Sequence, residues 1–185
     1  MTFAEGIQEV GRQGSIRAKR VLQQLLGESV DLPFNAYDNT SHLEFIDRRE
    51  FGGADGRFCF DLGGALKRKN VDKFDHQEAV EVLVEVKAQR AATGLLADYR
   101  EFLRRAAIAS TEARYASAWF IFYSTVPFGS NQGVQLVDGT LLRECAKNWP
   151  EPLRASVNNL PARIALVIAT DSFVTLLTTW VPDAT

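Results

Sequence analysis

The chain has few cysteines, few histidines and no long apolar run. Its two cysteines, Cys59 and Cys145, lie far apart among apolar neighbours, which favours buried free thiols over a disulfide framework. The two histidines, His42 and His76, lie apart from the cysteines and from each other, so a zinc site has little support. No apolar run is long enough to cross a bilayer, and the first residues lack the pattern of a signal peptide. We therefore expect a cytoplasmic protein with no membrane partner.

Several familiar catalytic motifs are also missing. The sequence contains no Gly-x-Ser-x-Gly motif and no Walker loop. Gly52-Gly53 and Gly63-Gly64 have no helix pattern close behind them, so they do not form a dinucleotide fingerprint. The net charge of −2 lacks the basic excess typical of nucleic-acid-binding domains, although local clusters matter more than the sum. Serine hydrolases, P-loop nucleotidases and dinucleotide-binding enzymes are thus disfavoured.

The order of helix and strand patterns predicts a mixed α/β fold. With 185 residues, 46% apolar and 24% charged, the chain fits one globular domain, 1–185. Periodicity predicts a helix over 4–26, with a kink or break near Gly11 and Gly14, and turn formers such as Pro33 and Asn35 predict a loop over 28–42. Further on, we expect strands at 43–51, 57–66 and 79–88, a helix at 94–113, a strand at 117–125, a helix at 139–148, a turn at 150–152, a strand at 163–170, and strand or helix at 172–181. A helix between the third and fourth strands is a crossover, which implies a mixed sheet with helices against its faces.

The most informative segment is Val82-Leu83-Val84-Glu85-Val86-Lys87. Side chains alternate along a strand, so Glu85 and Lys87 share one face and the valines share the other. An earlier acid, Asp61, follows an apolar run in the preceding predicted strand, where a carboxylate needs a reason such as a metal. Two carboxylates and an ammonium on neighbouring strands can hold a divalent cation and the water that it activates.

This pattern resembles the core of the PD-(D/E)XK, or restriction-endonuclease-like, nuclease superfamily. The α-β-β-β-α-β order is similar too, over a core of about 5–125, with 126–185 as a C-terminal elaboration of the sheet. The resemblance implies that Asp61, Glu85 and Lys87 are the catalytic residues, and that Asp61, Glu85 and the carbonyl of Val86 bind Mg²⁺ or Mn²⁺. Lys87 would then orient the attacking water or stabilise charge on the phosphate. The proline that names the family does not precede Asp61; Phe60 does.

Other residues are candidates for supporting roles. Asp55, in the turn before the second predicted strand, is an alternative to Asp61 as the first acid. Gln89 extends the motif to Glu-x-Lys-x-Gln, which is similar to Mrr-like endonucleases, and Glu9 is a candidate for the helical acid of many superfamily members. The basic run Lys67-Arg68-Lys69 is either a solvated loop or a grip on phosphates beside the site.

The expected function is that of an Mg²⁺-dependent DNA endonuclease. The resemblance points to an effector subunit or domain of a prokaryotic restriction or anti-phage defence system, paired with itself or with a sensor partner. Two alternatives stay open: an RNase, and a catalytically inactive module of the same fold that binds nucleic acid or protein. Glu-x-Lys is also a common solvated charge pattern on half-exposed strands.

Overall fold

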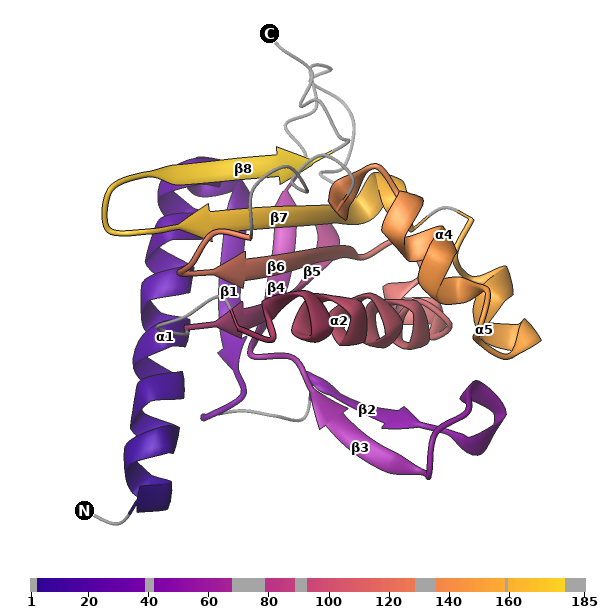
Figure 1. Ribbon diagram of the computed structural model, residues 1–185. Coiled ribbons are helices and arrows are strands. Elements are labelled where there is room, and N and C mark those ends of the chain that lie inside the picture. The colour runs from indigo at the N-terminus through magenta and orange to yellow at the C-terminus, as the bar shows by residue number, and fades with distance from the viewer. Residues whose placement is uncertain are drawn as a thin grey trace, which may run out of the picture.

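A six-stranded mixed sheet forms the centre of the molecule in the computed structural model, which describes residues 3–38, 42–67, 79–88, 93–128, 136–158 and 160–178 (Figure 1). The strand order is β1-β4-β5-β6-β7-β8. β1, β4 and β5 pair antiparallel, β5, β6 and β7 pair parallel, and β8 returns antiparallel to β7. The strands are Val30–Asn35, Leu62–Lys67, Ala79–Lys87, Trp119–Ser124, Ile164–Ala169 and Val174–Thr178. The prediction of a mixed α/β fold is confirmed, and 174–178 is a strand.

Helices cover both faces of this sheet and create two apolar cores. α1 (Phe3–Leu26) packs on the face that carries Val82, Val84 and Ile121. α2 (Leu95–Ala109) packs on the other face, against Leu83 and Phe120, and α4 (Thr140–Ala146) and α5 (Glu151–Ala155) contribute to the same core. The predicted alternation along β5 is therefore confirmed, since its valines face α1 and Leu83 faces α2. No helix among the described residues is both long and apolar enough to span a membrane.

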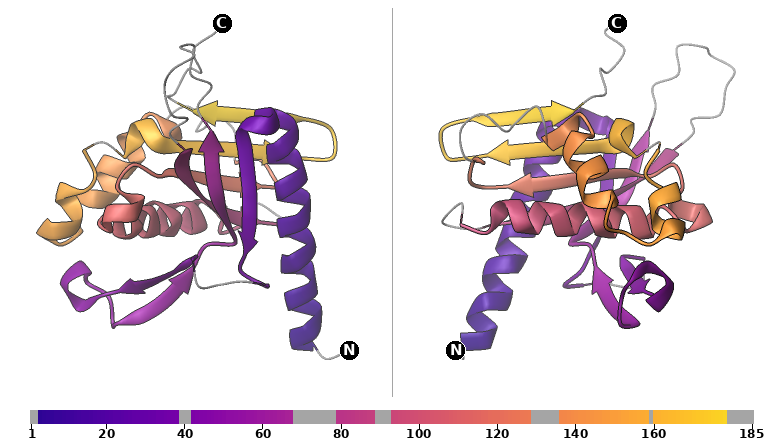
Figure 2. Two further views of the ribbon diagram at one scale, coloured as in Figure 1. Left: turned by 180° about the vertical axis from the view of Figure 1, so that it is seen from behind. Right: turned by 45° about the vertical axis from the view of Figure 1, so that its right-hand side comes forward.

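The predicted three-strand meander of 43–51, 57–66 and 79–88 is wrong. β2 (Glu44–Asp47) and β3 (Gly56–Cys59), joined by the short 3-10 helix Arg49–Phe51, form a separate two-stranded hairpin that projects from the main sheet (Figure 2). The predicted strand 57–66 is broken at Phe60 and Asp61, because the chain changes partners there. The N–H of Phe60 donates to the carbonyl of Leu43, which directly precedes β2. The N–H of Asp61 donates instead to the carbonyl of Val84 in β5.

The first strand of the main sheet is β1, within the segment 28–42 that the sequence predicts as a loop. Pro33 and Asn35 mislead here because β1 is an edge strand, and its register with β4 shifts between Asp31 and Phe34. Proline is tolerated at such edges and bulges, since its missing N–H leaves no ladder bond unmade. β1, β4 and β5 thus take the place of the expected meander.

The predicted break in the first helix is also wrong, because α1 continues through Gly11 and Gly14. A Cβ on Gly11 would lie 2.0 Å from the hydroxyl oxygen of Tyr37, and a Cβ on Gly14 would lie 2.6 Å from the Cβ of Ala88. The glycines therefore let the helix approach the end of β5 and the turn after β1 closely. Glycine lowers helix propensity, and the close packing of α1 against these neighbours offsets that cost.

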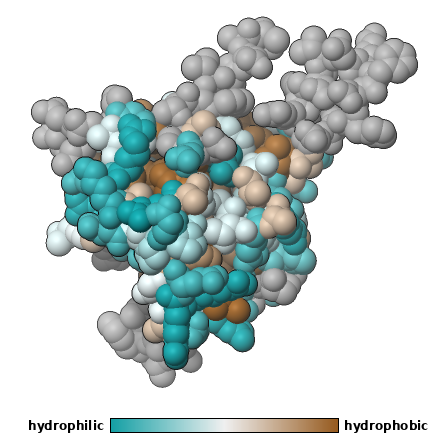
Figure 3. Space-filling model, turned by 90° about the vertical axis from the view of Figure 1, so that its right-hand side faces the viewer, coloured by the Kyte–Doolittle hydropathy of each residue, from teal (hydrophilic) through white to brown (hydrophobic). Residues whose placement is uncertain are grey.

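The remaining elements agree with the prediction to within a few residues, except that a helix, α5, starts in the expected turn at 150–152. Further 3-10 turns lie at Gly27–Ser29, Ala113–Tyr115 and Pro161–Arg163. Cys59 and Cys145 are free thiols, as expected, but each is only partly buried. The face on the right of Figure 1 is largely hydrophilic, and hydrophobic side chains surface there only in small separate areas (Figure 3).

Candidate active site

Asp61 is fixed against the end of β5 by two backbone contacts. It occupies the bend just before β4, and its N–H donates to the Val84 carbonyl at 2.9 Å. Its carboxylate oxygen Oδ2 accepts a hydrogen bond of 2.7 Å from the N–H of Val86. The break between β3 and β4 therefore places this carboxylate beside the Glu-x-Lys segment, although Asp61 is not itself within a strand.

Glu85 carries a nearly buried carboxylate beneath α2. Its side chain is 6% exposed, and its Oε1 lies 2.9 Å from the ammonium of Lys87 and 3.4 Å from Nη1 of Arg105 on α2. The other oxygen, Oε2, is buried and has no hydrogen-bond partner among the described residues. A buried acceptor left unpaired costs about 1–3 kcal/mol, so a metal ion, a water or another donor fits beside this oxygen.

Asp61 and Glu85 carry like negative charges, and their carboxylates repel each other. Burial raises the pKa of Asp61, and the nearby Glu85 carboxylate raises it further, to about 6, against the lowering effects of the Val86 N–H, Lys87 and Arg105. Burial lowers the pKa of Lys87, but the carboxylates of Glu85, Asp98 and Asp61 outweigh this, so the net pKa is raised and Lys87 stays an ammonium. A divalent cation between the two acids would relieve their repulsion.

The donor set fits a hard cation. Carbonyls two residues apart on a strand point to the same edge, so the Val86 carbonyl points, like that of Val84, to the edge where β4 begins. This carbonyl and the two carboxylates are oxygen donors of the kind that Mg²⁺ prefers, and Mg²⁺ needs only one or two carboxylates because it keeps several waters. Within the described ranges, no group of three or more His, Cys, Asp or Glu side chains could hold a metal ion. The fit therefore rests on the two acids, the carbonyl and the unpaired Oε2.

Asp55 belongs to a different part of the molecule. It lies at the turn of the β2–β3 hairpin with φ of 56°, and its carboxylate accepts a hydrogen bond from the Arg49 N–H and pairs with the Arg49 guanidinium at 2.8 Å. These contacts explain the acid as a local stabiliser of a tight turn. Of the two candidates for the first acid, Asp61 is the one that the structure places beside Glu85 and Lys87.

Of the remaining candidates for supporting roles, Glu9 and Lys67 fall within the described residues. Glu9 on α1 is bound to Arg12 and Gln13, which lowers its pKa, and it lines a cleft whose wall includes Ala88. Lys67 ends β4 opposite Ala79, whereas Leu62 pairs with Val84, so Lys67 lies roughly 20 Å along the strand from Asp61 and not beside the site. Gln89, Arg68 and Lys69 lie outside the described residues.

Two further residues lie beside the site: Tyr37, which no sequence pattern indicates, and Arg105, one of several arginines that the sequence offers for the same side. Burial raises the pKa of Tyr37, and the charges of Asp61 and Glu85 raise it further while Lys87 lowers it, so its hydroxyl feels the charges of the site. Arg105 is the α2 partner of Glu85 and lies over the Phe58 ring, 5.4 Å from its centre. No local pattern marks either residue, since both reach the site through tertiary packing.

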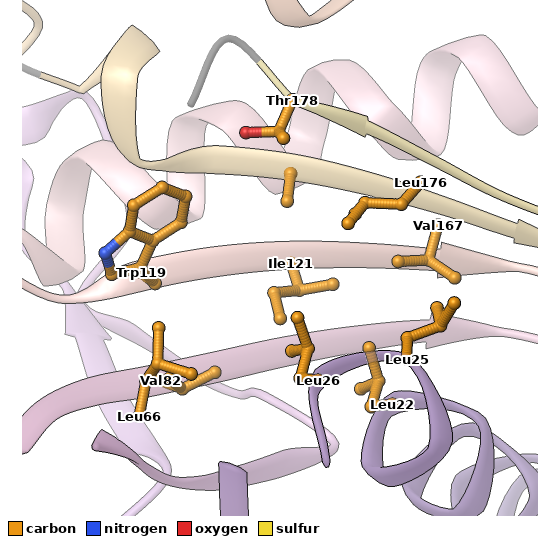
Figure 4. A pocket seen from close by; sticks show the side chains of 11 residues that line it. Leu22, Leu25, Leu26, Leu66, Val82, Trp119, Ile121, Val167, Leu176 and Thr178 are labelled. Carbon is orange, nitrogen blue, oxygen red and sulfur yellow. The ribbon is translucent and has the colours of Figure 1, made fainter. Parts of the chain in front are cut away.

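A separate small cavity lies under the C-terminal end of α1. It has a volume of about 30 Å³, and its walls include Leu22, Ile121 and Val167 (Figure 4). Its exposed lining is wholly apolar, and apolar cavities of this kind stay dry. We interpret it as a packing gap and not as a site.

Comparisons of the chain with models of known protein families, with curated proteins and with solved structures found no significant match.

Proposed function

We propose that this protein is a metal-dependent endonuclease that hydrolyses phosphodiester bonds of DNA, with a fold of the restriction-endonuclease-like, PD-(D/E)XK type. The observation that carries the proposal is the pairing of Asp61 with the end of β5, beside a buried Glu85 whose Oε2 lacks a partner and whose Oε1 contacts Lys87. Two carboxylates and a backbone carbonyl at one point supply the oxygen ligands that Mg²⁺ prefers.

The order of elements gives further support. α1, β1, β4, β5, α2 and β6 follow one another in the α-β-β-β-α-β order of that fold, with β2–β3 as an insertion and β7 and β8 as an extension of the sheet. Asp61 stands immediately before the second strand of this core, and Glu85 and Lys87 stand at the end of the third. Asp61 and the Glu85–Lys87 segment are therefore neighbours across the antiparallel pair of β4 and β5.

The side chains have distinct tasks in this proposal. Asp61, Glu85 and the carbonyl of Val86 would hold Mg²⁺ or Mn²⁺, which would supply Lewis-acid stabilisation of the phosphate charge. Lys87, kept protonated by its acidic neighbours, donates hydrogen bonds to the attacking water or to a phosphate oxygen. Arg105 holds the Glu85 carboxylate in place from α2. The Val86 N–H orients the Asp61 carboxylate from the backbone of β5.

A plasmid-nicking assay tests the proposal. Wild type should cut in Mg²⁺ or Mn²⁺ and not in chelator, and Lys87→Ala should lower the rate by at least about 100-fold while the protein stays folded. Lys67→Ala is the matched control, since it removes an equally charged residue at the opposite end of the same strand pair and should cut like wild type.

The alternatives give different results in the same assay. Cleavage of RNA in preference to DNA would identify an RNase. Retardation of DNA on a gel without any cleavage under either metal would identify a binding module. Equal rates for wild type and Lys87→Ala would show that the catalytic assignment is wrong. The proposed place in a prokaryotic defence system, with a sensor partner or a second copy of the chain, would be supported if cleavage depended on such a partner.

A further inference from the structure

A polar cleft separates α1 from the ends of the parallel strands. It has a volume of about 560 Å³ and is called the α1 cleft here. In Figure 1 the arrowheads of β6 and β7 point toward α1, and crevices at the carboxyl ends of parallel strands are common places for ligands. The cleft is lined by Glu9, Val10, Gln13, Gly14 and Arg17 of α1, by Ala88, Thr125 and Val126 after β5 and β6, and by Asp171 between β7 and β8.

The α1 cleft borders directly on the candidate active site. Ala88 follows Lys87 in the chain, and consecutive Cα atoms are about 3.8 Å apart. Because side chains alternate, Lys87 faces α2 while Val86 and Ala88 face α1, so the end of β5 separates the catalytic side chains from the cleft. A nucleic acid strand that places a phosphate at Lys87 has its neighbouring nucleoside within reach of this cleft.

The lining suits a neutral, hydrogen-bonding ligand better than a phosphate. Glu9 and Asp171 supply two carboxylates against the single guanidinium of Arg17, and Arg17 is itself paired with Asp171 at 3.0 Å. There is no excess of positive charge to bind an anion. The apolar walls include Val10, which is 57% exposed. Apolar walls with a few placed polar groups are typical of small-molecule sites.

Donors and acceptors are available along one face of the helix. Glu9, Gln13 and Arg17 are spaced by four residues, so they lie above one another on α1. The Gln13 amide donates one bond to Glu9 at 2.7 Å, which leaves its carbonyl oxygen as an acceptor. Tyr123 is buried on the same face of the sheet, and its hydroxyl lies close enough to Arg17 for the guanidinium to lower the pKa that burial raises.

We propose that the α1 cleft binds one unpaired nucleobase next to the scissile phosphate, so that the substrate is single-stranded or locally unpaired nucleic acid. This inference rests on the proposed nuclease function. A cleft of this size admits one group of nucleoside size, and α1, the strand ends and the Arg17–Asp171 pair bound it on several sides. A base in a duplex would have to leave its stack to enter, which costs energy that an unpaired base does not need.

The test combines a variant that fills the cleft with a matched control on the same helix. Val10→Trp places a large side chain in the cleft from an exposed position, and Gln13→Ala removes the amide. Gln24→Trp adds the same bulk at an exposed position outside the cleft lining. Binding is measured in chelator by the fluorescence anisotropy of a labelled single-stranded oligonucleotide, and thermal unfolding checks that each variant is folded.

The expected result is a loss of binding of at least about tenfold for Val10→Trp and a smaller loss for Gln13→Ala, with Gln24→Trp unchanged. In Mg²⁺, wild type should cut the single strand faster than a fully paired duplex, and an abasic residue beside the cleaved bond should slow it by about tenfold. In Val10→Trp the abasic and normal oligonucleotides should be cut equally.

Equal binding by wild type and Val10→Trp, or faster cleavage of the perfect duplex by wild type, would overturn the base-binding inference and leave the nuclease proposal standing. If no substrate is cut under either metal, the nuclease proposal is wrong. The binding measurement in chelator still decides whether the cleft takes a base, because it needs neither metal nor turnover.

Discussion

Replacing Arg105 by methionine tests whether Glu85 is held by cations at a place where a metal ion also binds. Arg105 Nη1 lies 3.4 Å from Glu85 Oε1, and Lys87 Nζ lies 2.9 Å from the same oxygen. Methionine removes the guanidinium, which lies over the Phe58 ring and also pairs with Glu101 at 3.2 Å, but keeps an unbranched apolar side chain of similar length. The variant therefore changes the charge beside Glu85 with little change in packing.

The size of the effect follows from the exposure and geometry of the pair. Unit charges about 4 Å apart interact by roughly 4 kcal/mol at an effective dielectric constant of 20. The Arg105 side chain is 27% exposed, its contact with Glu85 is long, and Lys87 remains as a partner. We expect the free energy of unfolding to fall by about 1–2 kcal/mol, which is roughly 2–8 °C in Tm for a chain of this size.

The same substitution should increase the response to Mg²⁺. In the proposed site Arg105 would compete with a metal ion for Glu85, so its removal should leave the carboxylate less neutralised and the metal more tightly bound. A tenfold gain in affinity adds up to about 1.4 kcal/mol to the stabilisation by saturating Mg²⁺. Urea or thermal unfolding in chelator and in Mg²⁺ measures both quantities.

Arg104→Met is the matched control for this experiment. Arg104 is the neighbouring residue on α2, but it binds Asp47 through both guanidinium nitrogens at 2.6 and 2.7 Å and the Phe51 carbonyl at 3.0 Å. Its removal should lower stability by about 2–3 kcal/mol and leave the Mg²⁺ response at the wild-type value. If Mg²⁺ stabilises wild type and both variants equally, or not at all, Glu85 is not a metal ligand that Arg105 neutralises.

Three further outcomes are expected. Gly14→Ala should destabilise the protein by about 1–3 kcal/mol because its Cβ would lie 2.6 Å from the Cβ of Ala88, which has no side-chain torsion with which to move away, and Ala88→Gly should recover much of that loss; additive effects in a double-mutant cycle would contradict the contact. Asp55→Ala should change stability by about 1 kcal/mol or less and leave cleavage intact, whereas Asp61→Ala should abolish cleavage; the reverse order of rates would make Asp55 the first acid. Because burial and Glu85 raise the pKa of Asp61 from 3.8 to about 6, the folded state in chelator loses up to about 3 kcal/mol as pH rises through this interval. Asp61→Asn should remove that loss and so exceed wild type in stability above pH 6 but not below pH 4, and parallel stability curves for the two proteins would refute the burial of an ionised Asp61.

Local sequence patterns correctly predicted the helices and strands that can be recognised without knowing which strand or helix they pack against. The alternation along 79–88 placed Glu85 and Lys87 on one face and the valines on the other, because a period of two is a property of the strand itself. The helix at 95–109 and the strands at 119–124 and 164–169 follow from periodicity and apolar runs in the same way.

Features that depend on pairing were missed. The apolar run 57–62 looks continuous, yet the chain changes from β2 to β5 at Phe60 and Asp61, and the sequence carries no local mark of that change. Pro33 hid an edge strand, and Gly11 and Gly14 suggested a broken helix where close packing required small residues. The register of β4 on β5 carries Lys67 to the far end from Asp61, which a list of basic residues could not reveal.

The break at Asp61 is what makes the candidate site possible. A continuous strand through 57–66 would have used the backbone of residue 61 in a ladder and turned its side chain to one face of the sheet. The bend instead directs the carboxylate to the Val86 N–H, at the edge where β4 begins and where the Val84 and Val86 carbonyls point. Glu85 and Lys87 then reach the same place from the α2 face, and Ala88 opens to the α1 cleft on the other. The end of β5 thus presents a charged centre on one side and the α1 cleft on the other, which is the arrangement that the proposed cleavage of an unpaired strand would use.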